Sequence, residues 1–359
     1  MITNQSPRVS IIIPAYNAEE TIEKCLTALR RQTTPLDSYE IIVVDDGSTD
    51  STCAQVTKIK NIRLFKQENA GPSAARNLGV NQALGEIVLF TDDDCEPVED
   101  WIDRMLGPFQ EEDIVGVKGT YLTRQKELVP RFVQLEFEDK YDRMSKDKFV
   151  DFIDTYSAGY RRSILIANNG FDTTFPVAST EDQELSFRLA QQGFKMVFEP
   201  RAKVYHLHHP RDIKEYWQKK FNIGYWKVVV HQRHPNKLLR DSHTPQILKL
   251  QILLIGISGL LLLLGFVWSP LWWLEGITGL IFLFSTIPFV VKAWHKDPPV
   301  ASISPILLFV RALALGMGFA SGLIFNLGNR EQLEKRNGLR SIIRQVVIRS
   351  LRILNPPKQ

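Results

Sequence analysis

One long apolar stretch constrains this chain more than any other feature. Between Leu250 and Val291 the only charged residue is Glu275, and the stretch is interrupted once, at Trp268-Ser269-Pro270. About 20 apolar residues are enough to cross the hydrocarbon core of a bilayer, so the sequence predicts a transmembrane hairpin over residues 247–291. Two helices buried in a protein core are the alternative, but soluble helices of this length normally keep a polar face.

A third apolar segment follows over residues 300–327, and it carries Arg311 near its middle. A central arginine costs about 2.5–3.5 kcal/mol on insertion scales, so we expect a re-entrant or interfacial segment, with a full third crossing as the alternative. Residues 328–359 then mix basic and apolar side chains, which is typical of an amphipathic helix on a bilayer with anionic lipids. Because cationic segments tend to stay on the cytoplasmic side, this tail favours two crossings over three.

The charges are unevenly divided along the chain, although the net charge is only +4. Residues 1–200 contain 22 basic and 33 acidic side chains, whereas residues 201–246 contain 10 and 3. Within residues 211–246 the lysines and arginines lie among tyrosine, tryptophan and phenylalanine. Such a mixture can bind nucleic acid, but here it directly precedes the membrane hairpin. We therefore expect a basic amphipathic interfacial helix and no nucleic-acid partner.

The N-terminal part has the composition of a cytoplasmic domain. The three cysteines, Cys25, Cys53 and Cys95, form no CxxC pair, which argues against a disulfide framework and against a thiolate zinc site. The first residues are polar and show no signal-peptide pattern. We expect residues 1–210 to form a cytoplasmic domain at the cytoplasmic membrane. The sequence indicates no oligomeric state.

Short β-branched runs alternate with helical patterns in the first 200 residues. The predicted strands are Val9–Pro14, Glu40–Val44, Ile62–Phe65 and Glu86–Phe90. This alternation is typical of an α/β domain whose parallel sheet is covered by helices on both faces.

Two of the predicted strands end in clusters of acidic residues, Asp45-Asp46 and Asp92-Asp93-Asp94. In open α/β sheets, ligands bind beyond the carboxyl ends of the strands. Carboxylates gathered there repel one another unless a cation lies between them, and their hard oxygens suit Mg²⁺ or Mn²⁺. Each cluster alone is also typical of a turn and helix cap, but a nucleoside diphosphate with its metal would satisfy both.

Five segments in sequence order resemble the motifs of family 2 glycosyltransferases. They are Val9–Asn17 (VSIIIPAYN), Ile42–Asp50 (IVVDDGSTD), Ala70–Gly79 (AGPSAARNLG), Leu89–Asp94 (LFTDDD) and Thr180–Leu189 (TEDQELSFRL). Any one of these motifs would be weak evidence, but five in order are specific. The resemblance implies a GT-A fold, which is a Rossmann-like nucleotide-diphospho-sugar transferase domain, followed here by a C-terminal helical membrane region.

The resemblance also implies roles for individual residues on the donor side. The set assigned to the nucleotide sugar is Pro14, Ala15, Tyr16, Asp46, Arg76, Asp92 and Asp93. Asp46 would accept a hydrogen bond from the base, and Arg76 would face the base or the diphosphate. Alternation along an extended segment puts Asp92 and Asp94 on one side, so Asp93 is expected to point elsewhere.

On the metal and acceptor side, the resemblance assigns Asp94 as the direct ligand of a Mn²⁺ or Mg²⁺ ion. Asp92 and His206 would complete the set, with His208 as the second choice among the histidines. Asp182 matches the general base of the family. The acceptor side is assigned to Gly159 and Glu181, and Thr180 is expected to cap the helix that begins there.

The implied activity is a metal-dependent, inverting transfer of one sugar to a lipid or lipid-linked acceptor. The donor would be a UDP-sugar in preference to a GDP-sugar. The processive members of the family carry a QxxRW motif, whereas this chain has Gln218-Lys219-Lys220-Phe221-Asn222, so a single transfer is favoured over chain extension. A glycan-extending transferase and a catalytically dead nucleotide-binding membrane scaffold are the alternatives.

Overall fold

The computed structural model describes residues 7–175, 178–237 and 241–325. An eight-stranded mixed sheet forms the centre of the N-terminal domain, with the strand order β3-β2-β1-β4-β7-β6-β8-β5. The strands are β1 (Val9–Ala15), β2 (Tyr39–Asp45), β3 (Ile62–Lys66), β4 (Ile87–Phe90), β5 (Cys95–Pro97), β6 (Ile114–Leu122), β7 (Ala158–Arg161) and β8 (Lys195–His206). The four strands predicted from the sequence are therefore present.

The four predicted strands pair in parallel, as expected, but the sheet also contains two antiparallel strands that were not predicted. β1, β2, β3 and β4 pair in parallel, as do β6 and β8, but β7 runs antiparallel to both of its neighbours and β5 runs antiparallel to β8. Both strands have only three or four residues, which is too short for an alternating pattern to reveal them as strands.

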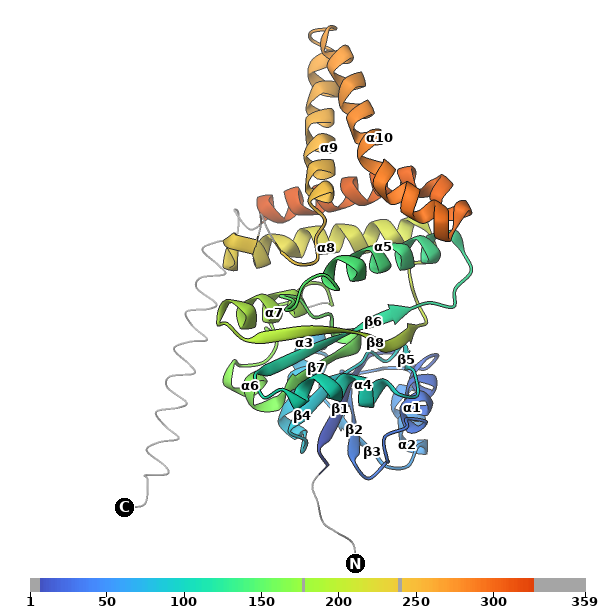
Figure 1. The fold of residues 1–359 in the computed structure, drawn as a ribbon, viewed down its shortest axis with the longest axis vertical. Coiled ribbons are helices and arrows are strands. Elements are labelled where there is room, and N and C mark those ends of the chain that lie inside the picture. The colour runs from blue at the N-terminus through green and yellow to red at the C-terminus, as the bar shows by residue number, and fades with distance from the viewer. Residues whose placement is uncertain (1–6, 176–177, 238–240, 326–359) are drawn as a thin grey trace, which may run out of the picture.

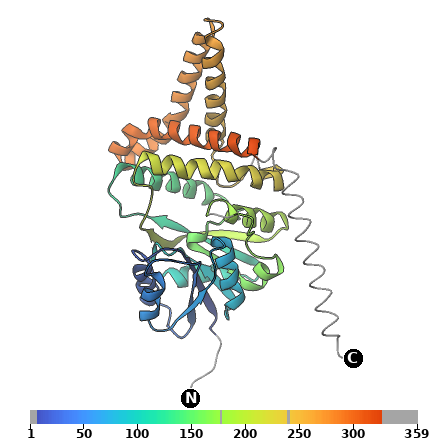
Figure 2. The same cartoon turned by 180° about the vertical axis from the view of Figure 1, so that it is seen from behind.

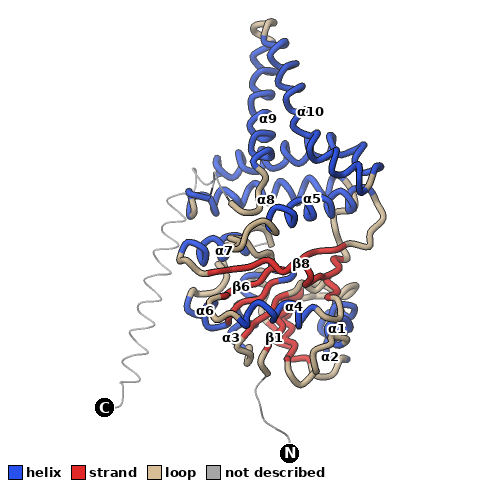
Figure 3. Tube along the Cα trace, viewed as in Figure 1, coloured by secondary structure: helices blue, strands red, loops and turns tan. Residues whose placement is uncertain are grey.

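Helices cover both faces of the sheet, as Figure 3 shows. The helices that pack on it or close to its edges are α1 (Ile22–Arg30), α2 (Thr52–Lys58), α3 (Pro72–Gln82), α4 (Trp101–Leu106), α6 (Arg162–Ala167) and α7 (Glu181–Gln191), with the short 3-10 turns η1 (Gly107–Gln110) and η2 (Thr155–Ser157). Successive residues of β1 divide between two apolar cores, because strand side chains alternate between faces. Ile11 and Ile13 pack with α1 and α4, whereas Ile12 packs with α3 and α7.

Three long helices lie across the domain on the side away from the N-terminus (Figures 1 and 2). They are α5 (Leu128–Met144), α8 (Ile213–Arg233), which is followed by η3 (Pro235–Lys237), and the helix Pro298–Phe325. We call these three helices the platform. Their shared core joins Phe132 of α5, Tyr216 of α8 and Leu308 of the last helix.

Two further helices, α9 (Gln246–Gly265) and α10 (Leu271–Lys296), stand upright on the platform as a hairpin (Figure 1). Many of their apolar side chains are exposed, including Leu263 of α9 at 71% and Trp273 of α10 at 82%. An exposed apolar surface on this scale is typical of a segment in contact with lipid. By length and composition, α9, α10 and Pro298–Phe325 are each able to cross a membrane.

The helix Pro298–Phe325 lies along α8 instead of standing beside the hairpin. A Cβ atom on Gly318 would lie 2.1 Å from the Phe221 carbonyl oxygen, and one on Gly322 would lie 2.5 Å from that of Tyr225. The two backbones are therefore in direct contact, which only glycine permits. In the most apolar part of the last helix, about half of the residues are buried within the protein, whereas about a fifth are buried in the corresponding parts of α9 and α10.

Arg311 points from this helix into the platform and not into an apolar surface. Its guanidinium donates from Nη1 to Glu136 Oε1 of α5 at 3.0 Å and from Nη2 to Gln251 Oε1 of α9 at 2.9 Å. Lys220 of α8 lies 3.0 Å from Glu136 Oε2. The cost of an arginine in this segment is thus offset by a buried carboxylate. The predicted basic tail, residues 328–359, lies outside the described residues.

Candidate active site

The acidic cluster after β4 is held against the end of β8. Asp92, Asp93 and Asp94 form the turn that leads from β4 into β5, and β5 pairs with β8 so that Cys95 lies opposite His206. This pairing places Asp94 Oδ2 3.1 Å from His206 Nε2. Burial raises the pKa of the Asp94 carboxyl, but His206, together with the charges of Lys219 and His208, outweighs burial and holds the pKa below its ordinary value.

The donor atoms gathered here fit a divalent cation. Ligand atoms of Asp92, Asp94 and Cys95 lie within 4.8 Å of one another, and His206 adds an imidazole nitrogen. Burial, followed by the charge of Asp94, raises the pKa of the Cys95 thiol well above its ordinary value, so the sulfur stays protonated and is a poor ligand. The remaining carboxylate and imidazole donors suit Mn²⁺ or Mg²⁺.

A neighbouring histidine that we did not predict supports His206. His209 Nδ1 lies 3.1 Å from His206 Nδ1, whereas His208, the second choice from the sequence, is exposed to solvent. Burial, and then the charge of His206, lowers the pKa of His209 to about 2, so His209 stays neutral. A neutral partner at Nδ1 fixes the ring of a metal-binding histidine.

The nucleotide-side residues meet at the ends of β1 and β4. Pro14 and Ala15 close β1, and the Tyr16 side chain that follows is 51% exposed. The Tyr16 backbone N–H donates to Asp93 Oδ2 at 3.3 Å. Through this hydrogen bond Asp93 ties the loop after β1 to the loop after β4.

Asp46 is buried, and hydrogen bonds occupy both of its carboxylate oxygens. Oδ1 accepts from the Ala70 N–H at 2.9 Å and from Gln67 Nε2 at 2.6 Å, and Oδ2 accepts from the Gly71 N–H at 2.9 Å. Asp46 therefore shapes the loop before α3. The sequence assigned Asp46 only to the nucleotide base, and these contacts within the loop were not predicted.

Arg76 joins the donor side to the acceptor side. From α3 its Nη1 donates to Glu181 Oε1 at 2.8 Å and its Nη2 donates to Asp92 Oδ1 at 3.2 Å. Arg76 and Glu181 are both buried, at 3% and 2% exposure. Glu181 is thus placed against Arg76, and the described structure brings together Arg76, Asp92 and the first turn of α7.

Asp182 lies in that first turn, and its environment suits a base. Burial, followed by the charges of Glu181 and Asp154, raises the pKa of Asp182 well above its ordinary value. Asp182 Oδ1 accepts from the Gln183 N–H at 2.7 Å. The predicted capping bond is wrong, because the buried Thr180 Oγ1 has no hydrogen-bond partner.

A cavity of about 210 Å³ opens beside Asp182. Its wall includes Asp154 and Thr180 near the base, and Leu248 and Leu315 on the membrane side. Gly159, the other predicted acceptor residue, is not part of this wall. It lies inside the sheet, where an added Cβ would be 2.8 Å from Leu89 Cδ2.

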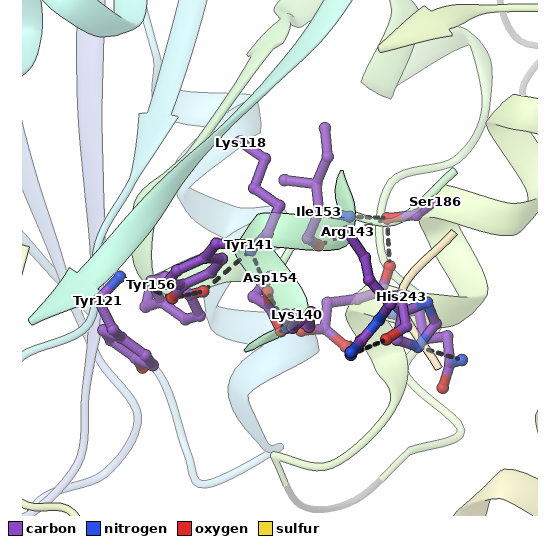
Figure 4. Close-up of polar contacts among 12 residues, drawn as sticks. Lys118, Tyr121, Lys140, Tyr141, Arg143, Ile153, Asp154, Tyr156, Ser186 and His243 are labelled. Carbon is purple, nitrogen blue, oxygen red and sulfur yellow. Dashed lines mark hydrogen bonds and ion pairs between the residues drawn. The ribbon is translucent and has the colours of Figure 1, made fainter. Parts of the chain in front are cut away.

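An ion-pair network behind Asp182 was also missed (Figure 4). Lys118 of β6 is fully buried and forms an ion pair with Asp154, and it donates to the Tyr156 hydroxyl at 2.9 Å. Lys140 Nζ lies 2.8 Å from the same Asp154 carboxylate. Burial lowers the pKa of Lys118 to about 7. A lysine inside a strand gave no sequence signal, because lysines are rarely buried.

The fold and the site together define the GT-A class of α/β glycosyltransferase domains. Residues 10–167 match the family model described as glycosyl transferase family 2. The chain is 31% identical over 242 residues to glycosyltransferase AglE of Haloferax volcanii, a match that covers 64% of this chain and 76% of that protein. The chain belongs to glycosyltransferase family 2.

Two further comparisons agree with this assignment. The pre-mycofactocin glycosyltransferase of Mycobacterium tuberculosis is 28% identical over 240 residues, which cover 64% of this chain and 48% of that protein. The mannosyltransferase PcManGT from Pyrobaculum calidifontis, solved with GDP-Man and Mn²⁺, superposes with a TM-score of 0.57 at 19% identity, covering 89% of this chain and 88% of that one. This second likeness shows the fold.

Proposed function

We propose that this protein is a metal-dependent inverting glycosyltransferase that moves one sugar from a nucleotide sugar to a lipid or lipid-linked acceptor at the cytoplasmic face of the membrane. The observation that carries the proposal is the position of Asp182. Asp182 lines a cavity that is also lined by Leu248 and Leu315 of the membrane-side helices, and its neighbour Glu181 is linked through Arg76 to Asp92 of the acidic cluster. A donor at the cluster and an acceptor in the cavity would meet at Asp182.

In this reaction the Asp182 carboxylate accepts the proton of the acceptor hydroxyl. The acceptor oxygen forms a bond to the anomeric carbon as the bond from that carbon to the diphosphate oxygen breaks, and the electron pair leaves with the nucleoside diphosphate. Attack from the face opposite the diphosphate inverts the anomeric centre. The raised pKa of Asp182 suits this task, since it makes the carboxylate a stronger base for the hydroxyl proton.

The remaining residues bind and orient the donor. Asp92, Asp94 and His206 would hold Mn²⁺ or Mg²⁺, which when bound neutralises charge on the departing diphosphate. Tyr16, with its exposed ring, and the loop shaped by Asp46 line the nucleotide side. The donor is proposed to be a UDP-sugar in preference to a GDP-sugar, on the family resemblance alone.

The direct test incubates the purified full chain in detergent with Mn²⁺, a total lipid extract and a panel of UDP- and GDP-sugars. We expect one donor to be consumed and one sugar to appear on a lipid product by mass spectrometry. A chelator should stop the reaction and added Mn²⁺ should restore it. Products with many added sugars would support the glycan-extending alternative, and a panel in which no donor is consumed would support the inactive scaffold.

A further inference from the structure

The cavity beside Asp182 joins the reaction site to the lipid-facing helices. It is lined by Asp182 and Thr180 of the N-terminal domain. It is also lined by Ile223 of α8, Leu248 of α9 and Leu315 of the helix Pro298–Phe325. An acceptor that reached Asp182 through this cavity would therefore have an apolar part among the platform and hairpin helices.

Five basic side chains line this cavity, against the four carboxylates of Glu136, Asp139, Asp154 and Asp182. The cavity is lined by the cations Lys140, Arg143, Lys220, Lys227 and Arg311. Four of them have carboxylate partners, which are Asp154 for Lys140, Asp139 for Arg143, and Glu136 for both Lys220 and Arg311. Lys227 forms no ion pair within 4.0 Å among the described residues, although the carboxylate of Asp241 acts on it from a greater distance.

Two residues that line the same cavity each have a buried polar atom without a hydrogen-bond partner. Thr180, which is 2% exposed, has a free Oγ1, and Arg311, which is 7% exposed, has a free Nε. Buried donors without partners are rare in folded proteins. Burial also lowers the pKa of Lys227 and outweighs the opposing charge of Asp241, as expected for an ammonium group that has lost more hydration than it has gained from carboxylates. A ligand with anionic oxygens would satisfy these groups.

We propose that this cavity binds the phosphate group of a phosphate-bearing lipid acceptor, with Lys227 as the counter-ion of the phosphate. The inference rests on the proposed function and names its acceptor class. The acceptor hydroxyl lies at Asp182, the phosphate lies at Lys227, and the hydrocarbon tail leaves along Leu248 and Leu315. The charge on Lys227 gives affinity for the phosphate, and the apolar side chains of the cavity wall select a lipid over a free phosphate.

The test measures equilibrium binding of farnesyl phosphate to the full chain in detergent, with farnesol and inorganic phosphate as the other two probes. The variant is Lys227→Met, and the matched control is Lys214→Met, which changes an exposed lysine of the same helix. We expect wild type and the control to bind farnesyl phosphate equally, and Lys227→Met to bind it at least about tenfold more weakly, the usual effect of losing one charge-assisted contact. Nucleotide binding by Lys227→Met should be unchanged, which shows that the variant is folded.

Three results would overturn the inference. They are equal affinity of Lys227→Met and wild type, binding of farnesol as tight as that of farnesyl phosphate, and competition by inorganic phosphate as strong as that by the lipid. The measurement uses no donor, so its failure is separate from failure of the proposed function, which is read from nucleotide-sugar consumption.

Discussion

The buried contact between Arg311 and Glu136 gives a quantitative test of how the last described helix is attached. The two side chains are 8% and 10% exposed, and removing one partner of a buried ion pair typically costs about 3–5 kcal/mol. In Arg311→Met, Glu136 would keep Lys220 at 3.0 Å and the Tyr216 hydroxyl at 3.0 Å. These remaining contacts limit the loss, so we expect about 2–3 kcal/mol for this variant.

The assay is thermal unfolding of the purified protein in detergent, followed by intrinsic tryptophan fluorescence. At about 2–4 °C per kcal/mol, Arg311→Met should lower the Tm by about 4–12 °C. Arg124→Met is the matched control, because Arg124 also pairs with a glutamate but is 62% exposed, and its loss should cost at most about 1 kcal/mol.

A double-mutant cycle with Glu136→Gln separates the contact from other effects of the substitution. We expect the two changes to be coupled by about 1–3 kcal/mol, as for residues that share a buried network. Additive effects, or an Arg311→Met variant as stable as wild type, would show that this helix does not dock on α5. In that case Arg311 would not have Glu136 as its partner within the platform. The preference for two membrane crossings over three would then lose its support.

Three other predictions concern the platform, the metal site and the pH dependence. Gly318→Leu should lower the free energy of unfolding by about 1–3 kcal/mol, since its Cβ would meet the Phe221 carbonyl oxygen; Gly256→Leu, with open space around it, should not, and equal loss in both variants would refute the close helix contact. His206→Ala should weaken Mn²⁺ binding, measured by calorimetry, at least about tenfold, and unchanged affinity would remove His206 from the ligand set. Since the pKa of Asp182 is raised and the base acts when deprotonated, transfer should fall as pH drops through that pKa. Lys118→Met removes the cation that offsets the charge of Asp154, so the pKa of Asp182 should rise further. The fall in transfer should then occur at a higher pH, and a shift to lower pH would contradict this effect of charge.

The features that the sequence could predict are local. The position of the acidic residues directly after an apolar strand was predictable, because the strand end and Asp92 and Asp94 are neighbours in the chain. The apolar stretch likewise predicted α9 and α10 from length and composition. The sequence also shows Gly318 and Gly322 in the last helix, but nothing in it indicates that these glycines pack against α8.

The features that the sequence did not predict depend on contacts between distant segments. Lys118 and Asp154 meet only because β6 and the segment before η2 lie side by side, and His209 gains its role from the ring of His206. Gly159 was assigned to the acceptor by its motif, but the mixed strand order buries it between β4 and β6.

The central claim is that Asp182 is the base of a sugar transfer, and the variant Asp182→Asn tests it most directly. The measurement compares sugar transfer to the lipid extract with nucleotide binding, in wild type, in Asp182→Asn and in Asp113→Asn, which changes an exposed carboxylate. Asparagine keeps the shape of the side chain but cannot accept the proton, so transfer should fall by about 10²–10⁴-fold while nucleotide binding is retained. Undiminished transfer by Asp182→Asn would contradict the account.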